Sequence, residues 1–150
     1  MKNNIRVTKE FTFEMAHALY GYDGACKNVH GHSYHLSVTV SGKPIDDINN
    51  VKNGMVIDFG DIKKIVKEHV VDKYDHAFMV NAKTPHAKLN PADYGYGDNF
   101  FKMDFQPTCE NMIIEFAKVL QIHLPKQVKL HSLKLRETAT SFVEWHAADN

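Results

Sequence analysis

The sequence lacks the features that mark several large classes of protein. It has only two cysteines, Cys26 and Cys109, in 150 residues, too few for a disulfide framework. Lys and Arg number 18, as do Asp and Glu, so no basic surplus is present for a nucleic acid or an anionic membrane. No stretch is long and apolar enough to span a bilayer, and residues 1–10 lack signal-peptide character. These absences predict a cytoplasmic protein with free thiols and neither a nucleic-acid nor a membrane partner.

Histidine is the residue type that is unusually frequent, with ten copies. Residues 26–32 read Cys-Lys-Asn-Val-His-Gly-His, and His17 precedes them. His30 and His32 leave the same face of an extended strand, while Gly31 between them leaves room for close backbone approach. Three histidines without an obvious fourth ligand suit a catalytic zinc ion with one open position. We therefore predict a Zn²⁺ site at His17, His30 and His32; the alternative is a set of hydrogen-bonded strand histidines.

Hydrophobic alternation predicts how these histidines meet. Residues 11–17 and residues 30–40 alternate as half-buried strands, and residues 19–29 between them contain the Gly and Asp of a loop. If the two strands pair as an antiparallel hairpin, all three histidines lie at its loop end. His35 has the opposite parity along the strand, which places it on the other face and excludes it from the site.

Two helices are expected after the hairpin. A helical period begins beyond Asp58, which could cap the helix, as could Asp61, and the helix should end near Asp72. Thr108 is the expected N-cap of a second helix, and Pro125 stops it.

The remaining segments are two strands and one long loop. Residues 128–135 change parity midway, which predicts a bulge near His131 and Ser132, and residues 141–145 form a last strand. Residues 82–106 have no clear period and predict a surface loop of a length that is usually functional or mobile.

These elements together predict an α+β fold. Their order is β-β-α-α-β-β, with two helices on one face of a four-stranded antiparallel sheet, in a single domain over residues 1–150 with residues 82–106 as a loop insertion. The sheet edges carry no obvious protection, which favours pairing between copies of the chain.

Cys26 is the first candidate for chemistry beside the histidines. It could be a fourth zinc ligand, which would make the site structural, or a base and nucleophile beside an open metal position. The hydrophilic loop and the Lys27 charge favour thiolate formation. Periodicity leaves both roles open.

Two further positions carry acidic and basic groups. Asp75 and His76 could form a relay in which the carboxylate orients the imidazole; the alternative is a histidine in a polar turn. Glu137 shares the face of Leu133 and Leu135, and a buried carboxylate needs donors. A ligand with two parallel N–H groups would supply them, and a salt bridge is the alternative.

Five segments in order resemble the motifs of the 6-pyruvoyl-tetrahydropterin synthase family. They are His17 with Cys26-x-x-x-His30-Gly31-His32, residues 55–59, Tyr74-Asp75-His76, residues 107–111 and residues 135–138. The gap between Cys26 and His30 is similar to that of the bacterial branch in queuosine biosynthesis. The resemblance covers residues 11–145, nearly the whole chain.

The resemblance implies the tunnelling fold. In it, trimers close their sheets into a barrel and two trimers stack into a homo-hexamer, with active sites at subunit boundaries. Asp75 and His76 would then reach a pocket whose zinc and Cys26 belong to a neighbouring chain. By the same resemblance Glu137 anchors a pterin through a bidentate, charge-assisted pair.

The implied activity is that of a zinc-dependent lyase. It converts 7,8-dihydroneopterin triphosphate to 6-carboxy-5,6,7,8-tetrahydropterin, acetaldehyde and triphosphate, with zinc as Lewis acid and no redox cofactor. Cys26 would move protons, with His76, oriented by Asp75, as its partner. Glu110 and Thr108 would line the substrate pocket.

The product, one motif residue and the triphosphate contacts are less well defined by the sequence. The product could instead be the pyruvoyl pterin or an aldolase-type hydroxymethyl pterin, and a non-catalytic zinc or pterin-binding protein is a candidate from another class. Cys109 replaces the Ser or Thr that is usual in the family motif. The triphosphate needs cations, and the sequence does not choose among its candidates, Lys27, Lys73, Lys88 and Arg136.

Overall fold

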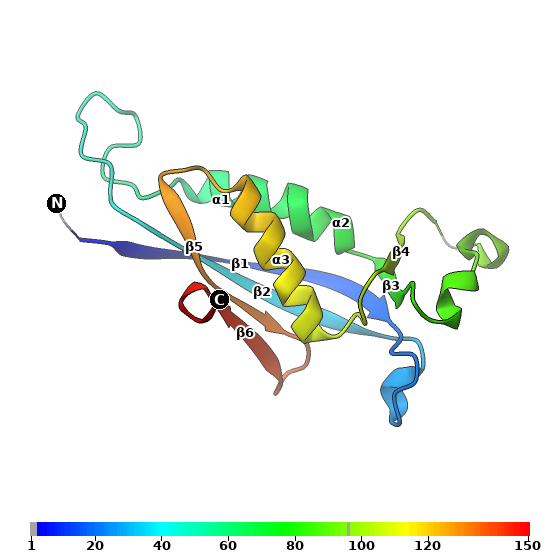
Figure 1. The fold of residues 1–150 in the computed structure, drawn as a ribbon. Coiled ribbons are helices and arrows are strands. Elements are labelled where there is room, and N and C mark those ends of the chain that lie inside the picture. The colour runs from blue at the N-terminus through cyan, green and yellow to red at the C-terminus, as the bar shows by residue number, and fades with distance from the viewer. Residues whose placement is uncertain (1–2, 96) are drawn as a thin grey trace.

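Two long strands form the centre of the protein. The computed structural model describes residues 3–95 and 97–150. Strand β1 (Ile5–His17) pairs antiparallel with β2 (His30–Gly42) along its whole length, as Figure 1 shows. Alternate residues of both strands are buried, which confirms the predicted hairpin.

Helices cover one face of this hairpin (Figure 1). The helical elements are α1 (Phe59–Val66), a π-helical turn (Lys67–Val71), α2 (Asp72–Tyr74) and α3 (Cys109–His123). The first three follow one another without a break, so the helical segment extends two residues beyond the predicted end. The Asp58 side chain caps α1 and that of Thr108 caps α3, each by accepting a backbone N–H, as predicted.

The sheet differs from the prediction. Four more strands flank the hairpin: β3 (Ala77–Asn81), β4 (Phe100–Met103), β5 (Val128–Arg136) and β6 (Phe142–His146). The strand order is β4-β3-β1-β2-β5-β6, and the β1–β3 and β3–β4 pairs are parallel. The four-stranded antiparallel sheet was therefore wrong in number and direction. Strands of four and five residues are too short to show a reliable alternation.

Residues 82–106 are more ordered than the predicted loop. They contain two 3₁₀ turns (Pro85–Lys88 and Pro91–Tyr94) and the edge strand β4. Both turns begin with proline, and a side chain caps each of them, so turn chemistry accounts for the missing periodicity.

The predicted bulge is present in β5. Thr39 pairs with Ser132 and Val40 pairs with Leu130, which leaves His131 as the extra residue. The bulge changes the parity of the strand, so that leucines on both sides of it face the core.

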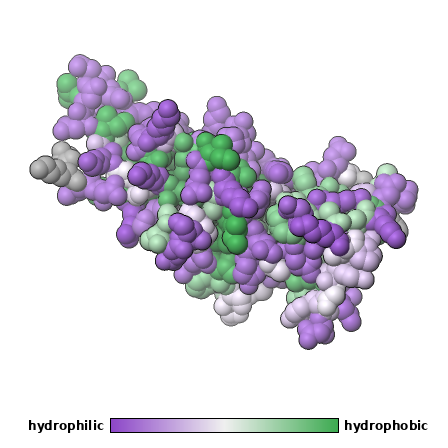
Figure 2. Space-filling model, viewed as in Figure 1, coloured by the Kyte–Doolittle hydropathy of each residue, from purple (hydrophilic) through white to green (hydrophobic). Residues whose placement is uncertain are grey.

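The two faces of the sheet have opposite character. The helix side carries a continuous apolar core, and on β1 its alternation runs through Phe13 and Met15 to His17, which is 1% exposed. The other side is polar; there the Ser33 hydroxyl donates to Glu14 Oε2 at 2.8 Å. Figure 2 shows that hydrophilic residues dominate the visible surface around a small hydrophobic band.

Among the helices formed by the described residues, none has the length and apolar character needed to cross a bilayer.

We predict that α3 contributes to stability through one buried face. Leu120 is 0% exposed, so Leu120→Ala should lower the free energy of unfolding by about 2–5 kcal/mol through lost burial and a residual cavity. Urea unfolding of the purified protein measures this change. Ile122 on the same helix is 76% exposed, and Ile122→Ala should stay within about 0.5 kcal/mol of the parent. Equal effects of the two variants would contradict the assigned packing.

Candidate metal centre and adjoining cavity

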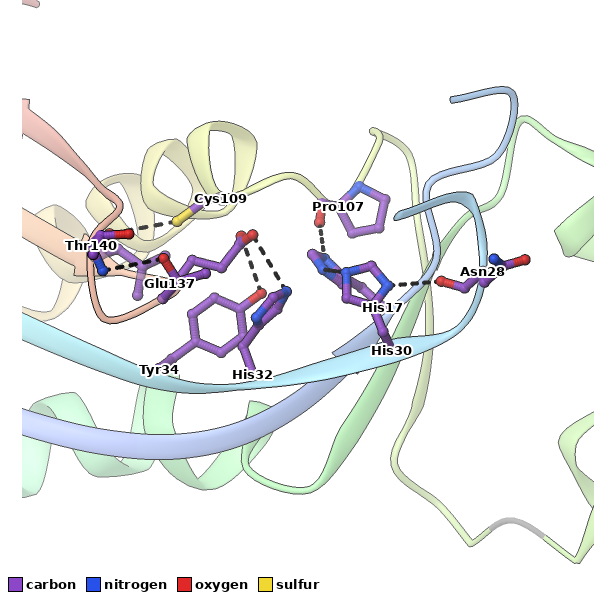
Figure 3. Close-up of polar contacts among 11 residues, drawn as sticks. His17, Asn28, His30, His32, Tyr34, Pro107, Cys109, Glu137 and Thr140 are labelled. Atoms are coloured by element: carbon purple, nitrogen blue, oxygen red, sulfur yellow. Dashed lines mark hydrogen bonds and ion pairs between the residues drawn. The ribbon is translucent and has the colours of Figure 1, made fainter. Parts of the chain in front are cut away.

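Three imidazoles converge at the loop end of the hairpin. His17 and His30 are register partners, and His32 lies two residues further along β2. One potential ligand atom from each of the three rings lies within 4.8 Å of the others. Figure 3 shows the three side chains. A Cβ at Gly31 would lie 3.2 Å from the Met15 carbonyl oxygen, which confirms the close backbone approach at this glycine.

Backbone carbonyls fix the orientation of two of the rings. His17 Nδ1 donates to the Pro107 oxygen at 2.7 Å, and His30 Nδ1 donates to the Asn28 oxygen at 2.8 Å. A carbonyl only accepts, so in the neutral rings both protons sit on Nδ1 and both Nε2 atoms carry lone pairs. These two Nε2 atoms are 3.0 Å apart. Facing lone pairs repel each other unless a cation or a proton lies near both.

The third ring supplies an unpaired donor atom. Nε2 of His32 is buried and has no hydrogen-bond partner among the residues that the structure describes. Glu137 Oε1 lies 3.4 Å from it, near enough for a charge pair but outside hydrogen-bond geometry. A buried nitrogen without a partner is costly, and a bound metal ion would satisfy it.

Burial keeps the central ring in the form that binds metals. Desolvation lowers the pKa of His17, opposed by the Pro107 carbonyl and the charge of Glu137. A neutral imidazole is the metal-binding form. The three residues therefore fit a metal ion held by imidazole nitrogens. His35 is exposed and faces away from them, as predicted.

A cavity of about 350 Å³ adjoins the metal donors. Its lining brings together five of the predicted site residues, from the β1–β2 hairpin, the start of α3 and the β5–β6 turn: His17, Cys26, Thr108, Glu110 and Glu137. Chain segments far apart in sequence thus meet at one concave surface. A cavity with convergent polar groups next to metal donors is a strong candidate for a ligand site.

Cys26 lies beside the metal donors and not among them. It sits in a 3₁₀ turn, Ala25–Lys27, as a half-buried free thiol. Within residues 3–95 and 97–150, the group of converging donors contains the three histidines without this sulfur. That geometry favours an open metal position over a closed four-ligand site.

Glu137 lines the same cavity, and Figure 3 shows its carboxylate facing Tyr34 and His32. The Tyr34 hydroxyl donates to Glu137 Oε2 at 3.5 Å. Cys109, also in the lining, is buried, and its Sγ donates to the Leu135 oxygen at 3.5 Å. Burial, and then the charge of Glu137, raises the pKa of Cys109 to about 12, so this thiol stays protonated. Sequence reasoning did not assign Tyr34 to the site, although it shares the face of the β2 histidines.

Asp75 and His76 make the predicted contact. Asp75 Oδ1 accepts from the Glu14 backbone N–H at 2.9 Å and lies 3.1 Å from His76 Nδ1. The Glu14 N–H, followed by His76, holds the pKa of Asp75 below its usual value. His76 has φ +60, a conformation that a non-glycine residue rarely adopts. The surrounding structure therefore holds this residue in place.

The pair does not enter the Cys26 cavity of its own chain. His76 is exposed and lines a separate cavity, also of about 350 Å³, with Glu14 and Gly31. A meeting of His76 with Cys26 therefore stays a prediction that involves a second chain.

The chain is similar to known proteins over nearly its whole length. The family model for 6-pyruvoyl tetrahydropterin synthase matches residues 6–148. The 6-carboxy-5,6,7,8-tetrahydropterin synthase of Haemophilus influenzae is 37% identical over 150 residues, covering 93% of this chain and 97% of the relative. The Rickettsia typhi enzyme of the same name is 30% identical, covering 93% and 99%.

Solved structures show the same fold. An uncharacterised protein from Wolinella succinogenes superposes with a TM-score of 0.75 at 19% identity, covering 97% of this chain and 99% of that one. The 6-pyruvoyl tetrahydropterin synthase of Caenorhabditis elegans gives 0.69 at 21% identity, covering 97% and 96%. With a family match across almost its whole length, this chain belongs to the 6-pyruvoyl tetrahydropterin synthase family.

Proposed function

We propose that this protein is a zinc-dependent lyase of queuosine biosynthesis that acts in the cytoplasm. It converts 7,8-dihydroneopterin triphosphate to 6-carboxy-5,6,7,8-tetrahydropterin, with release of acetaldehyde and triphosphate. The names of the Haemophilus influenzae and Rickettsia typhi relatives support this product. The observation that carries the proposal is a cluster of three converging imidazoles beside a cavity that also holds a thiol and a carboxylate.

Zinc is the metal that best matches the donor set. Three imidazoles with a vacant position are typical of catalytic zinc, and neutral imidazole binds this ion well. When bound, zinc would supply Lewis acidity to the hydroxyls of the substrate side chain. The chain's own contribution is orientation, because carbonyls hold the Nδ1–H groups of His17 and His30 and turn both Nε2 atoms inward.

Glu137 is the group that binds the pterin ring. Its carboxylate can accept from the ring N–H and the exocyclic amino group in parallel, a bidentate, charge-assisted contact. Its present contacts, to Tyr34 at 3.5 Å and to His32 at 3.4 Å, are long and leave acceptor capacity for a ligand. Thr108 and Glu110 line the same cavity and complete the pocket.

Cys26 and His76 are the proton-transfer groups. Cys26 moves protons at the side-chain carbons of the substrate, and His76, oriented by Asp75, is its partner. Because the two residues line different cavities of one chain, the partner comes from a neighbouring chain. A homo-hexamer of two stacked trimers would provide this arrangement. The short edge strands β4 and β6 are available for pairing between copies.

The triphosphate would need cationic contacts, for which the candidates are Lys27, Lys73, Lys88 and Arg136. Arg136 lines a cavity of about 400 Å³ that also contains Glu137 and Ser33. Lys73 and Arg136 both contact aromatic faces: Lys73 Nζ lies 4.9 Å from the Tyr74 ring centroid, and the Arg136 guanidinium carbon lies 5.0 Å from that of Phe142.

A direct assay distinguishes the proposed activity from the alternative products and from a non-catalytic binding protein. Incubation of the zinc-loaded protein with 7,8-dihydroneopterin triphosphate should yield acetaldehyde in step with 6-carboxytetrahydropterin. A pyruvoyl or hydroxymethyl pterin without acetaldehyde would assign a sister reaction. No turnover with tight pterin binding would identify a binding protein.

We expect His17→Ala to lose the metal. Because His17 is buried and supplies one of three converging nitrogens, its removal should lower bound zinc from one ion per chain to a small fraction, as measured by elemental analysis after dialysis. His35→Ala is the matched control on the opposite face and should keep the full zinc content. Loss of zinc from both variants, or from neither, would contradict the assigned site.

Cys26→Ala tests whether the thiol acts beside the metal or holds it. Since Cys26 lies outside the donor cluster, we expect full zinc content and a fall in turnover of about 10²-fold or more, the scale of a lost proton-transfer group. Zinc analysis and acetaldehyde release measure the two effects on one sample. Zinc release by this substitution would show that the sulfur is a fourth ligand and the site structural.

A further inference from the structure

A buried tyrosine, Tyr34, contacts both the histidine cluster and Glu137. The Tyr34 side chain is 0% exposed, and its ring stacks on Phe13 with centroids 5.1 Å apart and planes 11° apart. Its ring also packs edge-to-face against His32 at 5.6 Å and against His17 at 6.4 Å. The core therefore fixes this ring, and the ring supports two of the three metal donors.

The hydroxyl of Tyr34 contacts Glu137. It donates to Glu137 Oε2 at 3.5 Å, while Glu137 Oε1 lies 3.4 Å from Nε2 of His32. The carboxylate thus spans the gap between the tyrosine and a metal donor, as Figure 3 shows. In this contact the phenolic O–H is the donor and the carboxylate oxygen is the acceptor.

Packing alone does not call for this hydroxyl. A phenyl ring would fill the same space, and a buried hydroxyl needs a hydrogen-bond partner to offset its desolvation. Tyr74 shows the contrast: it is 1% exposed, and its hydroxyl has no hydrogen-bond partner within the described part of the chain. The Tyr34 hydroxyl differs because it faces the carboxylate at the cavity.

We propose that Tyr34 is a positioning residue that holds the Glu137 carboxylate at a set place relative to the metal donors. A flat ligand with two parallel N–H groups, bound by Glu137, then has its side chain directed to the metal. This inference rests on the proposed function. The 3.5 Å contact is long without a ligand, and such contacts commonly shorten in the bound complex.

The test is Tyr34→Phe in zinc-loaded protein, with unreactive pterin as the probe. We expect unchanged zinc content and an increase of about tenfold in the pterin dissociation constant, measured by fluorescence quenching, from loss of one hydrogen bond to a charged group. Tyr74→Phe removes an equally buried hydroxyl away from the cavity and should leave pterin affinity unchanged. An unaltered affinity in Tyr34→Phe, or loss of its zinc, would overturn the inference.

A double-mutant cycle separates positioning from a general packing effect. If Tyr34 acts through Glu137, adding Tyr34→Phe to Glu137→Ala should weaken pterin binding no further. Additive losses would show that Tyr34 contacts the ligand or the fold independently and would refute the positioning role. If the parent protein binds no pterin, the proposed function falls and this inference with it. If the parent and Tyr34→Phe bind pterin with equal affinity, this inference is refuted and the proposed function is not.

Discussion

The structure depends on the mutual approach of three imidazole nitrogens at the end of an apolar face. His17 and His30 present their Nε2 atoms to each other at 3.0 Å because backbone carbonyls hold their Nδ1–H groups. In the absence of charge compensation, such an arrangement costs free energy, and burial of His17 increases that cost. A cation at the common point turns this repulsion into attraction. The fold therefore provides a group of three imidazoles that could hold a metal ion.

The same apolar face connects the three histidines to Glu137, the proposed ligand anchor. Alternation along β1 places Phe13 and His17 on one side, and alternation along β2 does the same for Tyr34 and His32. Glu137 enters from the β5–β6 turn to meet them. Phe13 and Tyr34 belong to the packed core, so the polar groups beside them rest against side chains that cannot easily move.

Sequence reasoning succeeded where side-chain parity decides the structure. The positions of His17, His30 and His32, the exclusion of His35 and the bulge at His131 all follow from a period of two. The two helix caps follow from side-chain chemistry. These features are local, so a single sequence contains them.

Three features were not predicted from the sequence. β3 and β4 are short, so no local period predicts them. The β1–β3 and β3–β4 pairs are parallel and join strands that are not neighbours in a hairpin. The π-helical turn at Lys67–Val71 also left no pattern distinct from an ordinary helix. The role of Tyr34 depends on a contact with a residue 103 positions away, which parity cannot reveal.

The central claim is that three ring nitrogens bind zinc and leave a position open for the substrate. X-ray absorption spectroscopy at the zinc edge of the metal-loaded protein tests it most directly. The account predicts three nitrogen scatterers at about 2.0–2.1 Å with an oxygen scatterer in the remaining position. A sulfur scatterer at about 2.3 Å would show a closed site and contradict the account.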